Sequence, residues 1–149
     1  MTDKIEKRVF LRATRAKVWR AISDAKQFSA WFGVTLVGEF AAGQSIRGKV
    51  TYKGLEHLTM ELDVVAIEPE RYFAYRWHPA ALDPKVDYSS EPTTLVEFEL
   101  ADADGGCQLS IRESGLDKIP EARRANVLRL NSQGWTEQAA NIEKYLASA

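Results

Sequence analysis

Alternating apolar and polar positions run through most of the first 115 residues and predict a β-sheet. Residues 5–13 alternate, with Ile5, Val9 and Leu11 on one face. The same period of two recurs from residue 35 to residue 115, in six further short segments separated by turns. Alternate residues of a strand share a face, and strands joined by short connections pair antiparallel. The pattern predicts about seven antiparallel strands in one twisted, curved sheet.

Helical spacing replaces this alternation in three places. Residues 14–22 and 23–32 each place apolar residues at helical intervals, behind Thr14 and Asp24 as N-cap residues. Residues 121–147 predict one long helix of roughly 40 Å, the only element able to cover the apolar face of the sheet. We therefore predict an α+β fold with two short helices after the first strand and a long helix at the C-terminal end.

Composition and charge narrow the class of protein. The 149 residues, 45% hydrophobic and 28% charged, predict one globular domain over 1–149. A net charge of −1 with scattered basic residues argues against nucleic-acid binding. No apolar run is long enough for membrane insertion, and the N-terminal residues do not resemble a signal peptide. The one cysteine, Cys107, permits no intrachain disulfide and fits a cytoplasmic location.

Four segments in register resemble a known family. They are TRAKVWRAISDAKQFSAWF (14–32), VVAIEPERYFAYRW (64–77), TTLVEFEL with CQLSIRESGL (93–116), and GWTEQAANIEKYL (134–146). Together they resemble the helix-grip fold of the START/Bet v 1-like (SRPBCC) superfamily, and within it the Hsp90-ATPase-activator-homologue (AHSA1-like) branch. The resemblance implies a hydrophobic cavity between the curved sheet and the C-terminal helix. It implies little about activity, because one fold serves many functions.

The predicted cavity wall is rich in aromatic residues, with a few polar groups among them. Ligand pockets commonly have this composition. The candidate cavity and ligand-binding residues are Trp31, Phe32, Tyr52, Met60, Phe73, Tyr75, Trp77, Phe98, Glu113, Asn131, Gly134, Trp135 and Gln138. Residues 79–92 contain Pro79, Pro84 and Pro92 without periodicity, and we expect this long loop to act as a lid over the mouth.

Catalytic chemistry has only two weak candidates, Glu113 and His78. Glu113 shares the inward face of its strand with Leu109 and Ile111, which allows a buried polar anchor or acid/base group. The alternative, which we favour, is a strand end with Glu113 at the rim in water. Strand alternation points His78 outward, although a bulge near Pro79 could turn it toward the cavity mouth. We favour a surface or capping histidine.

Metal and cofactor motifs are not found in the sequence. Two histidines and one cysteine give no zinc-binding spacing, and no phosphate- or dinucleotide-binding glycine motif is found. Ser110, Ser114 and Cys107 have no base at a spacing that would indicate a nucleophilic triad. We predict no metal and no cofactor.

A glycine within the last helix marks the site most sharply. Gly134 should cost the helix about 1 kcal/mol relative to alanine, yet it lies on the inward stripe between Leu130 and Gln138. Either the missing side chain admits a bulky neighbour such as Trp77, or it leaves space open beside the helix.

The sequence names neither a ligand nor a reaction. We favour a binding protein for a hydrophobic or aromatic small molecule. A cyclase- or hydrolase-like enzyme using the same cavity is the first alternative. An Hsp90-type co-chaperone is the second, although eukaryotic activators carry an additional N-terminal domain and this chain begins at its first strand. We also consider a homodimer through an edge strand or the outer sheet face, where Tyr72 is unexplained.

Overall fold

The computed structural model describes residues 4–83 and 85–148 of the chain. Within these residues, seven strands form one antiparallel sheet in the order β1-β7-β6-β5-β4-β3-β2. The strands are β1 (Lys4–Leu11), β2 (Val34–Val37), β3 (Ser45–Val50), β4 (Thr59–Glu68), β5 (Tyr72–Trp77), β6 (Thr94–Ala103) and β7 (Gly106–Ser114). This arrangement confirms the predicted curved antiparallel sheet.

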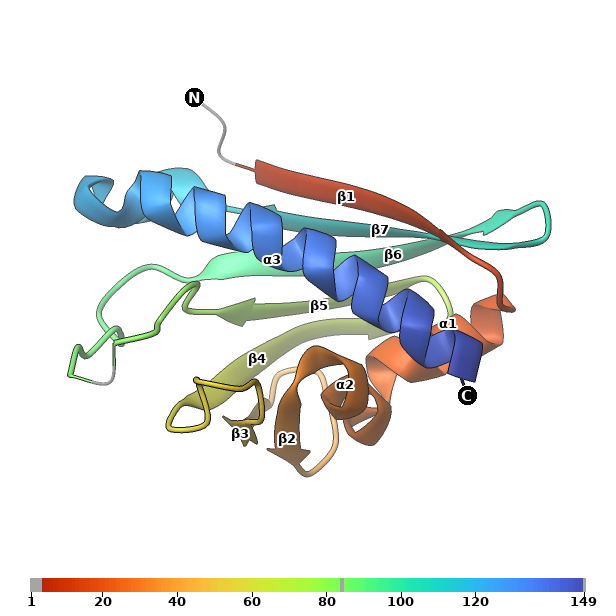
Figure 1. Ribbon diagram of the computed structural model, residues 1–149, viewed down its shortest axis with the longest axis horizontal. Coiled ribbons are helices and arrows are strands. Elements are labelled where there is room, and N and C mark those ends of the chain that lie inside the picture. Colours follow the sequence, from red (N-terminus) through yellow and green to blue (C-terminus); the bar gives the residue numbers. More distant parts are fainter. Residues whose placement is uncertain (1–3, 84, 149) are drawn as a thin grey trace.

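Three α-helices and one short 3-10 helix complete the described part of the chain. They are α1 (Arg15–Ser23), α2 (Ala25–Phe32), the 3-10 helix η1 (Leu116–Lys118) and α3 (Glu121–Ser148). The helix α3 runs along the concave side of the sheet, and α1 and α2 lie near its C-terminal end (Figure 1). The helix η1 was not predicted from the sequence, and Pro84 of the predicted loop lies outside the described residues.

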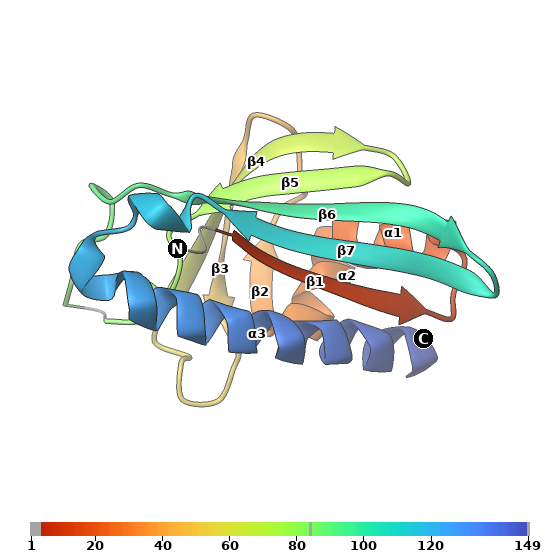
Figure 2. The same ribbon diagram turned by 90° about the horizontal axis from the view of Figure 1, so that it is seen from above.

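The position of the two short helices explains the strand order. β1 pairs with β7 from Leu11↔Cys107 to Lys4↔Ser114, so the first strand lies beside the last one. The helices α1 and α2 then carry the chain across to β2, at the opposite edge of the sheet. Seen from above, the sheet curves around the space that α2 and α3 face (Figure 2). The concave side of the sheet and α3 therefore face each other across the interior of the protein.

Both short helices begin at the predicted caps. The Thr14 hydroxyl accepts a hydrogen bond from the Lys17 backbone N–H at 3.2 Å, and the Asp24 carboxylate accepts one from the Lys26 backbone N–H at 3.0 Å. The helix α2 ends at Gly33, whose φ of 94° lies in the left-handed region that glycine adopts freely. The helices α1 and α2 are 9 and 8 residues long, about two turns each.

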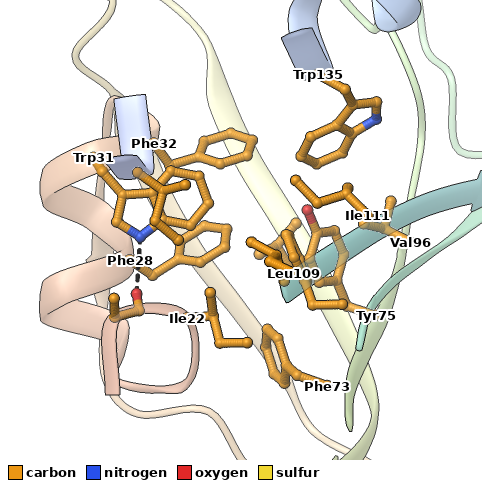
Figure 3. Close-up of a cluster of buried hydrophobic side chains, with 14 of the residues drawn as sticks. Ile22, Phe28, Trp31, Phe32, Phe73, Tyr75, Val96, Leu109, Ile111 and Trp135 are labelled. Carbon is orange, nitrogen blue, oxygen red and sulfur yellow. Dashed lines mark hydrogen bonds between the residues drawn. The ribbon is translucent and has the colours of Figure 1, made fainter. Parts of the chain in front are cut away.

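The core is an aromatic cluster between the central strands and α2. Phe73 and Phe98, on β5 and β6, stack with ring centroids 6.1 Å apart. Phe28 and Trp31 of α2 lie opposite them, and the Trp31 indole donates to the Ala21 carbonyl oxygen at 2.8 Å (Figure 3). Large buried rings of this kind contribute much of the stability of a small domain. The alternation predicted for β5, β6 and β7 places the buried face as expected.

One strand is regular only in part, and another is shorter than predicted. The faces predicted for β4 hold as far as Val64, and a bulge between Val64 and Ala66 then shifts its register against β5. A bulge adds one residue to a strand and reverses the faces beyond it. The strand predicted over 35–40 is shorter, because β2 ends at Val37 and pairs only with β3.

Candidate ligand-binding site

A cavity of about 410 Å³ lies between α3, the end of α2 and the sheet, at the end of the molecule where β5 stops. The loop after β5 forms one side, and the segment between β3 and β4 forms another. The lining residues are Phe32, Gly33, Val50, Tyr52, Leu55, Leu58, Thr59, Met60, Glu61, Trp77, His78, Ala80, Ala81, Leu82, Tyr88, Leu130, Asn131, Gly134, Trp135, Glu137 and Gln138. Most of these side chains are apolar or aromatic.

Many residues predicted for the cavity are brought together on its wall. Those that line it are Phe32, Tyr52, Met60, Trp77, Asn131, Gly134, Trp135 and Gln138. They come from α2, β4, β5, α3 and the segment after β3, which are far apart in the sequence. Their role in binding remains a prediction, because shape alone does not identify a ligand.

Other predicted residues lie behind the wall rather than on it. Trp31, Phe73, Tyr75, Phe98 and Glu113 are buried and are not among the lining residues. Strand and helix periodicity indicated their inward direction but not their depth. The aromatic cluster fills the space at the centre of the sheet, and this cavity lies toward the end of β5.

Three rings form the boundary between the core and the cavity. The centroids of Phe32 and Trp77 are 6.0 Å apart, those of Phe32 and Trp135 are 6.1 Å apart, and those of Trp77 and Trp135 are 5.7 Å apart. Phe32 and Trp135 face each other in Figure 3, with the Tyr75 hydroxyl directed toward the gap between them. The three rings therefore separate a packed interior from an open one.

Glu113 lies behind this boundary and is completely buried. Its Oε1 accepts hydrogen bonds from Trp135 Nε1 at 2.9 Å and Asn131 Nδ2 at 2.8 Å. Its Oε2 accepts from Trp77 Nε1 at 2.9 Å and from the Thr94 hydroxyl at 2.5 Å. An ionised carboxylate only accepts hydrogen bonds, and all four partners donate. The favoured prediction of a water-exposed rim position is wrong, because four donors replace the water that Glu113 would otherwise need.

The same hydrogen bonds limit what Glu113 can do chemically. Each oxygen already accepts two hydrogen bonds, and the carboxylate does not reach the cavity surface. A general acid or base must come within hydrogen-bond distance of the group it serves. The geometry therefore fits a polar anchor that holds the strands and α3 together.

The charge of Glu113 also acts on the buried Tyr75. Burial raises the pKa of the Tyr75 hydroxyl well above its usual value, and the charge of Glu113 raises it further. Among the described residues the hydroxyl has no hydrogen-bond partner. Such a group normally costs free energy when it is buried without a partner.

Gln138 and Asn131 use their amide N–H groups within the protein. Gln138 Nε2 donates to the Phe32 carbonyl oxygen at 2.8 Å, which ties the end of α2 to α3. Gln138 Oε1 accepts from Asn141 Nδ2 at 3.0 Å. Only part of the polar capacity predicted for the cavity is therefore available to a ligand.

His78 is half-buried and lines the cavity, and its role there stays a prediction. The strand β5 ends at Trp77, so alternation no longer sets the direction of the next side chain. A ring nitrogen, Nε2, lies 3.1 Å from the Glu91 carbonyl oxygen, which connects the two ends of the loop. Ala80, with a φ of 50°, turns the chain immediately afterwards.

The loop over residues 79–92 is held to α3 by Arg123. Its guanidinium donates to the Glu91 carboxylate at 3.0 Å and to the carbonyl oxygens of Pro79 and Ala80 at 3.3 and 3.4 Å. It also lies 4.8 Å from the centroid of the Tyr88 ring. Sequence reasoning missed this contact because Arg123 looks like an ordinary polar residue of an amphipathic helix.

The structure shows whether Gly134 admits a bulky neighbour or leaves space open beside α3. A Cβ built on Gly134 would have no atom within 4 Å outside its own helix backbone and chain neighbours, and the residue lines the cavity. The glycine therefore leaves space open, and it does not accommodate a bulky neighbour such as Trp77. Leu82 and Tyr88 of the loop, and Gly33 at the end of α2, were not singled out from the sequence.

In the described part of the chain, no group of three or more His, Cys, Asp or Glu side chains could hold a metal ion.

Cys107 is a buried residue on β7, and burial raises the pKa of its thiol. Within residues 4–83 and 85–148, no helix combines the length and apolar character required to cross a bilayer.

A curved antiparallel sheet that holds a long C-terminal helix, with a cavity between them, defines the α+β helix-grip class. The chain belongs to one family of this class: residues 12–147 match the family model for "Activator of Hsp90 ATPase homolog 1-like protein". This match confirms the resemblance inferred from the four sequence segments. No curated protein matches the chain significantly in sequence.

Solved structures share the fold at low sequence identity. Protein MLL2253 from Mesorhizobium loti is 20% identical with a TM-score of 0.76, and the alignment covers 98% of each chain. The Aha1 dimer from Colwellia psychrerythraea is 14% identical with a TM-score of 0.73, over 98% of this chain and 96% of that one. DynU16, from the dynemicin biosynthetic locus, is 22% identical with a TM-score of 0.75 over 99% of this chain. The chain spans 48% of DynU16.

Proposed function

We propose that the protein binds a hydrophobic or aromatic small molecule in the cavity between the sheet and α3. The observation that carries this proposal is an apolar cavity of about 410 Å³. Known ligand pockets occupy about 300–1,000 Å³, with mostly apolar walls and few polar groups. Protein interiors are otherwise packed as closely as organic crystals, so an open volume of this size needs an explanation.

The wall residues support binding over a simple packing defect. Gly134 keeps the helix surface open at a position where alanine would favour the helix by about 1 kcal/mol. Trp77 and Trp135 hold their N–H groups toward Glu113, which fixes the rings that bound the cavity. An accidental void would not require such a rigid support.

We further propose that the loop over residues 79–92 acts as the lid of this cavity. Leu82 and Tyr88 of the loop contribute to the wall, and Arg123 connects the loop to α3. A ligand that enters past these side chains would have to loosen the Arg123 contacts temporarily. Long irregular loops often perform this role.

The proposal can be tested with N-phenyl-1-naphthylamine, a neutral aromatic probe whose fluorescence rises in apolar surroundings. We expect the wild-type chain to bind the probe and to gain thermal stability from it, because a ligand of the native state stabilises that state. Gly134→Leu should place a side chain in the cavity and reduce binding at least about tenfold, the effect of 1.4 kcal/mol on a dissociation constant. Gly134→Ala is the matched control with a smaller obstruction.

Two results of this experiment would overturn the proposal. If the probe neither fluoresces with the wild-type chain nor raises its Tm, the cavity does not take aromatic ligands. Equal binding by the wild-type chain and Gly134→Leu would place the probe elsewhere on the protein. Circular dichroism of each variant verifies that the fold is retained.

The alternatives have less support. An enzyme using Glu113 would need a carboxylate within reach of a ligand, and this one is occupied by four donors. A co-chaperone role rests on the name of the family and on the fold shared with Aha1, and a pull-down against Hsp90 tests it.

The Aha1 relative was solved as a dimer, which supports a homodimer through the unpaired edges of β1 or β2 as a further proposal. A cytoplasmic location remains a proposal that rests on the lone cysteine.

A further inference from the structure

The charged side chains that line the cavity are acidic, and the nearby Arg123 guanidinium lies behind the lining residues Ala80 and Tyr88, where it pairs with Glu91. Among the described residues that line it, the charged side chains are Glu61 and Glu137, and neither lysine nor arginine is present. Arg47 pairs with Glu61 at 2.6 Å between Nε and Oε2, so the charge of Glu61 is largely compensated. Glu137 accepts a long hydrogen bond of 3.5 Å from the Gln133 amide and has no ion pair within the described part of the chain.

The buried carboxylate of Glu113 adds a second negative charge behind the wall. Its four hydrogen-bond donors are uncharged, since they are two indoles, an amide and a hydroxyl. Charge is not cancelled by neutral donors, and its field is weakly screened in an apolar interior. Glu113 therefore lies buried behind the indole part of the wall, and Glu137 is an exposed carboxylate of the lining itself.

The two indole rings favour a cationic ligand over an anionic one. Trp77 and Trp135 direct their N–H groups toward Glu113, so they offer ring carbons rather than donors to a ligand. An N–H donated to a carboxylate shifts electron density into the ring, as hydrogen bonds in series polarise one another. Aromatic faces attract cations, and tryptophan does so most strongly.

A carboxylate ligand would meet the opposite conditions. The cavity offers it no guanidinium or ammonium partner among the described lining residues, and the indole N–H groups and the Asn131 amide are already engaged by Glu113. His78 is the one remaining side chain of that lining able to carry a positive charge, and its Nε2 lies at hydrogen-bond distance from the Glu91 carbonyl oxygen. A buried anion without a partner is strongly disfavoured.

We propose that the cavity selects an apolar or aromatic molecule that carries an ammonium group and rejects the corresponding carboxylate. This inference rests on the proposed binding function and specifies the class of ligand. The ammonium group would lie near Glu137 and the rings of Trp77 and Trp135, and the apolar portion would fill the space beside Gly134.

The test compares three probes with one chain length and different charges. Decylamine, decanol and decanoate are each used to displace N-phenyl-1-naphthylamine from the protein at neutral pH, below their micelle concentrations. We expect decylamine to displace the probe at about tenfold lower concentration than decanoate, with decanol between them. Glu137→Gln should reduce this ratio to about threefold. Glu143→Gln is the matched control, an exposed residue of α3 that does not line the cavity.

The outcomes separate the two proposals. If the aromatic probe binds but decanoate displaces it as well as decylamine, the charge preference is wrong while the binding function stands. If decanol is the strongest competitor, the cavity is merely apolar and the ammonium proposal is overturned. Equal ratios in Glu137→Gln and Glu143→Gln would overturn the role given to Glu137. Failure of the aromatic probe itself would overturn the binding function.

Discussion

At the scale of single residues, two glycines occupy opposite surroundings. A Cβ on Gly134 would enter open space, whereas a Cβ on Gly48 of β3 would lie 2.1 Å from the Thr35 carbonyl oxygen of the neighbouring strand. At Gly134, helix propensity therefore determines how an alanine substitution affects stability. At Gly48, steric exclusion determines it. The same substitution should have opposite effects on stability.

We expect Gly134→Ala to raise the free energy of unfolding by up to about 1 kcal/mol, because alanine favours the helix and its methyl group meets no obstacle. Gly48→Ala should lower it by about 1–3 kcal/mol through overpacking against β2. Urea denaturation followed by circular dichroism measures both. A destabilised Gly134→Ala variant would contradict the open space beside the helix.

At the scale of secondary-structure elements, Glu113 joins the strands β5, β6 and β7 to α3. Its partners come from the end of β5, the start of β6 and the middle of α3, while Glu113 itself lies near the end of β7. One carboxylate therefore fixes the relative position of three strands and a helix. Without it, four donors would be buried without an acceptor.

Replacing Glu113 by glutamine tests this connection. One acceptor oxygen becomes an NH2 group that must face indole or amide donors, and each buried donor left without a partner costs about 1–3 kcal/mol. We expect Glu113→Gln to lose at least that much stability in urea denaturation. Glu143→Gln should be unchanged, and equal stability of the two variants would show that the four hydrogen bonds contribute little.

Arg123 performs a comparable task for the loop over residues 79–92. We expect Arg123→Ala to release the loop, because it removes the ion pair to Glu91 and the contact with Tyr88. Limited proteolysis should then cleave within the loop several times faster, with little change in global stability. Arg129→Ala, on the exposed side of α3, serves as the control. Unchanged cleavage would contradict the role of Arg123 in holding the loop.

At the scale of the whole molecule, two tyrosines link stability to alkaline pH. Burial, followed by the hydrogen bond to Glu97, raises the pKa of Tyr72 from 10.0 to about 12. This bond, 2.5 Å long, also explains the tyrosine on the outer sheet face. Burial and Glu113 raise the pKa of Tyr75 well above its usual value. Both groups stay neutral in the folded chain at a pH where the unfolded chain has lost their protons.

The sign of the pH effect follows from this difference. Below pH 10 both states hold the protons, and the stabilisation is complete; as pH rises from 10 toward 12, the unfolded chain binds fewer protons and stability falls. We expect Tyr75→Phe and Tyr72→Phe each to flatten this fall in urea midpoint. At neutral pH, Tyr75→Phe should cost nothing, since its hydroxyl has no partner among the described residues. Curves parallel to wild type would contradict the shifted pKa values.

The fold could be predicted from the sequence because its determinants are local. Alternation in β5 gives the inward direction of Phe73 and Tyr75, and caps such as Thr14 start the short helices. The site was harder, because its properties arise from residues distant in the chain. The surroundings of Glu113 depend on Trp77 and Trp135, and no pattern on its own strand reveals them. The depth of each inward residue likewise depends on how far the aromatic core extends.

The paired indoles of Trp77 and Trp135 have a consequence for spectroscopy. They are two of the four tryptophans of the chain, and their rings lie 5.7 Å apart at 34° in the cavity wall. Transition dipoles this close couple, so the pair should give an exciton couplet in the circular dichroism spectrum. Any molecule that enters the cavity alters the environment of both rings. The protein thus carries an intrinsic, label-free optical signal that reports whether its cavity is occupied.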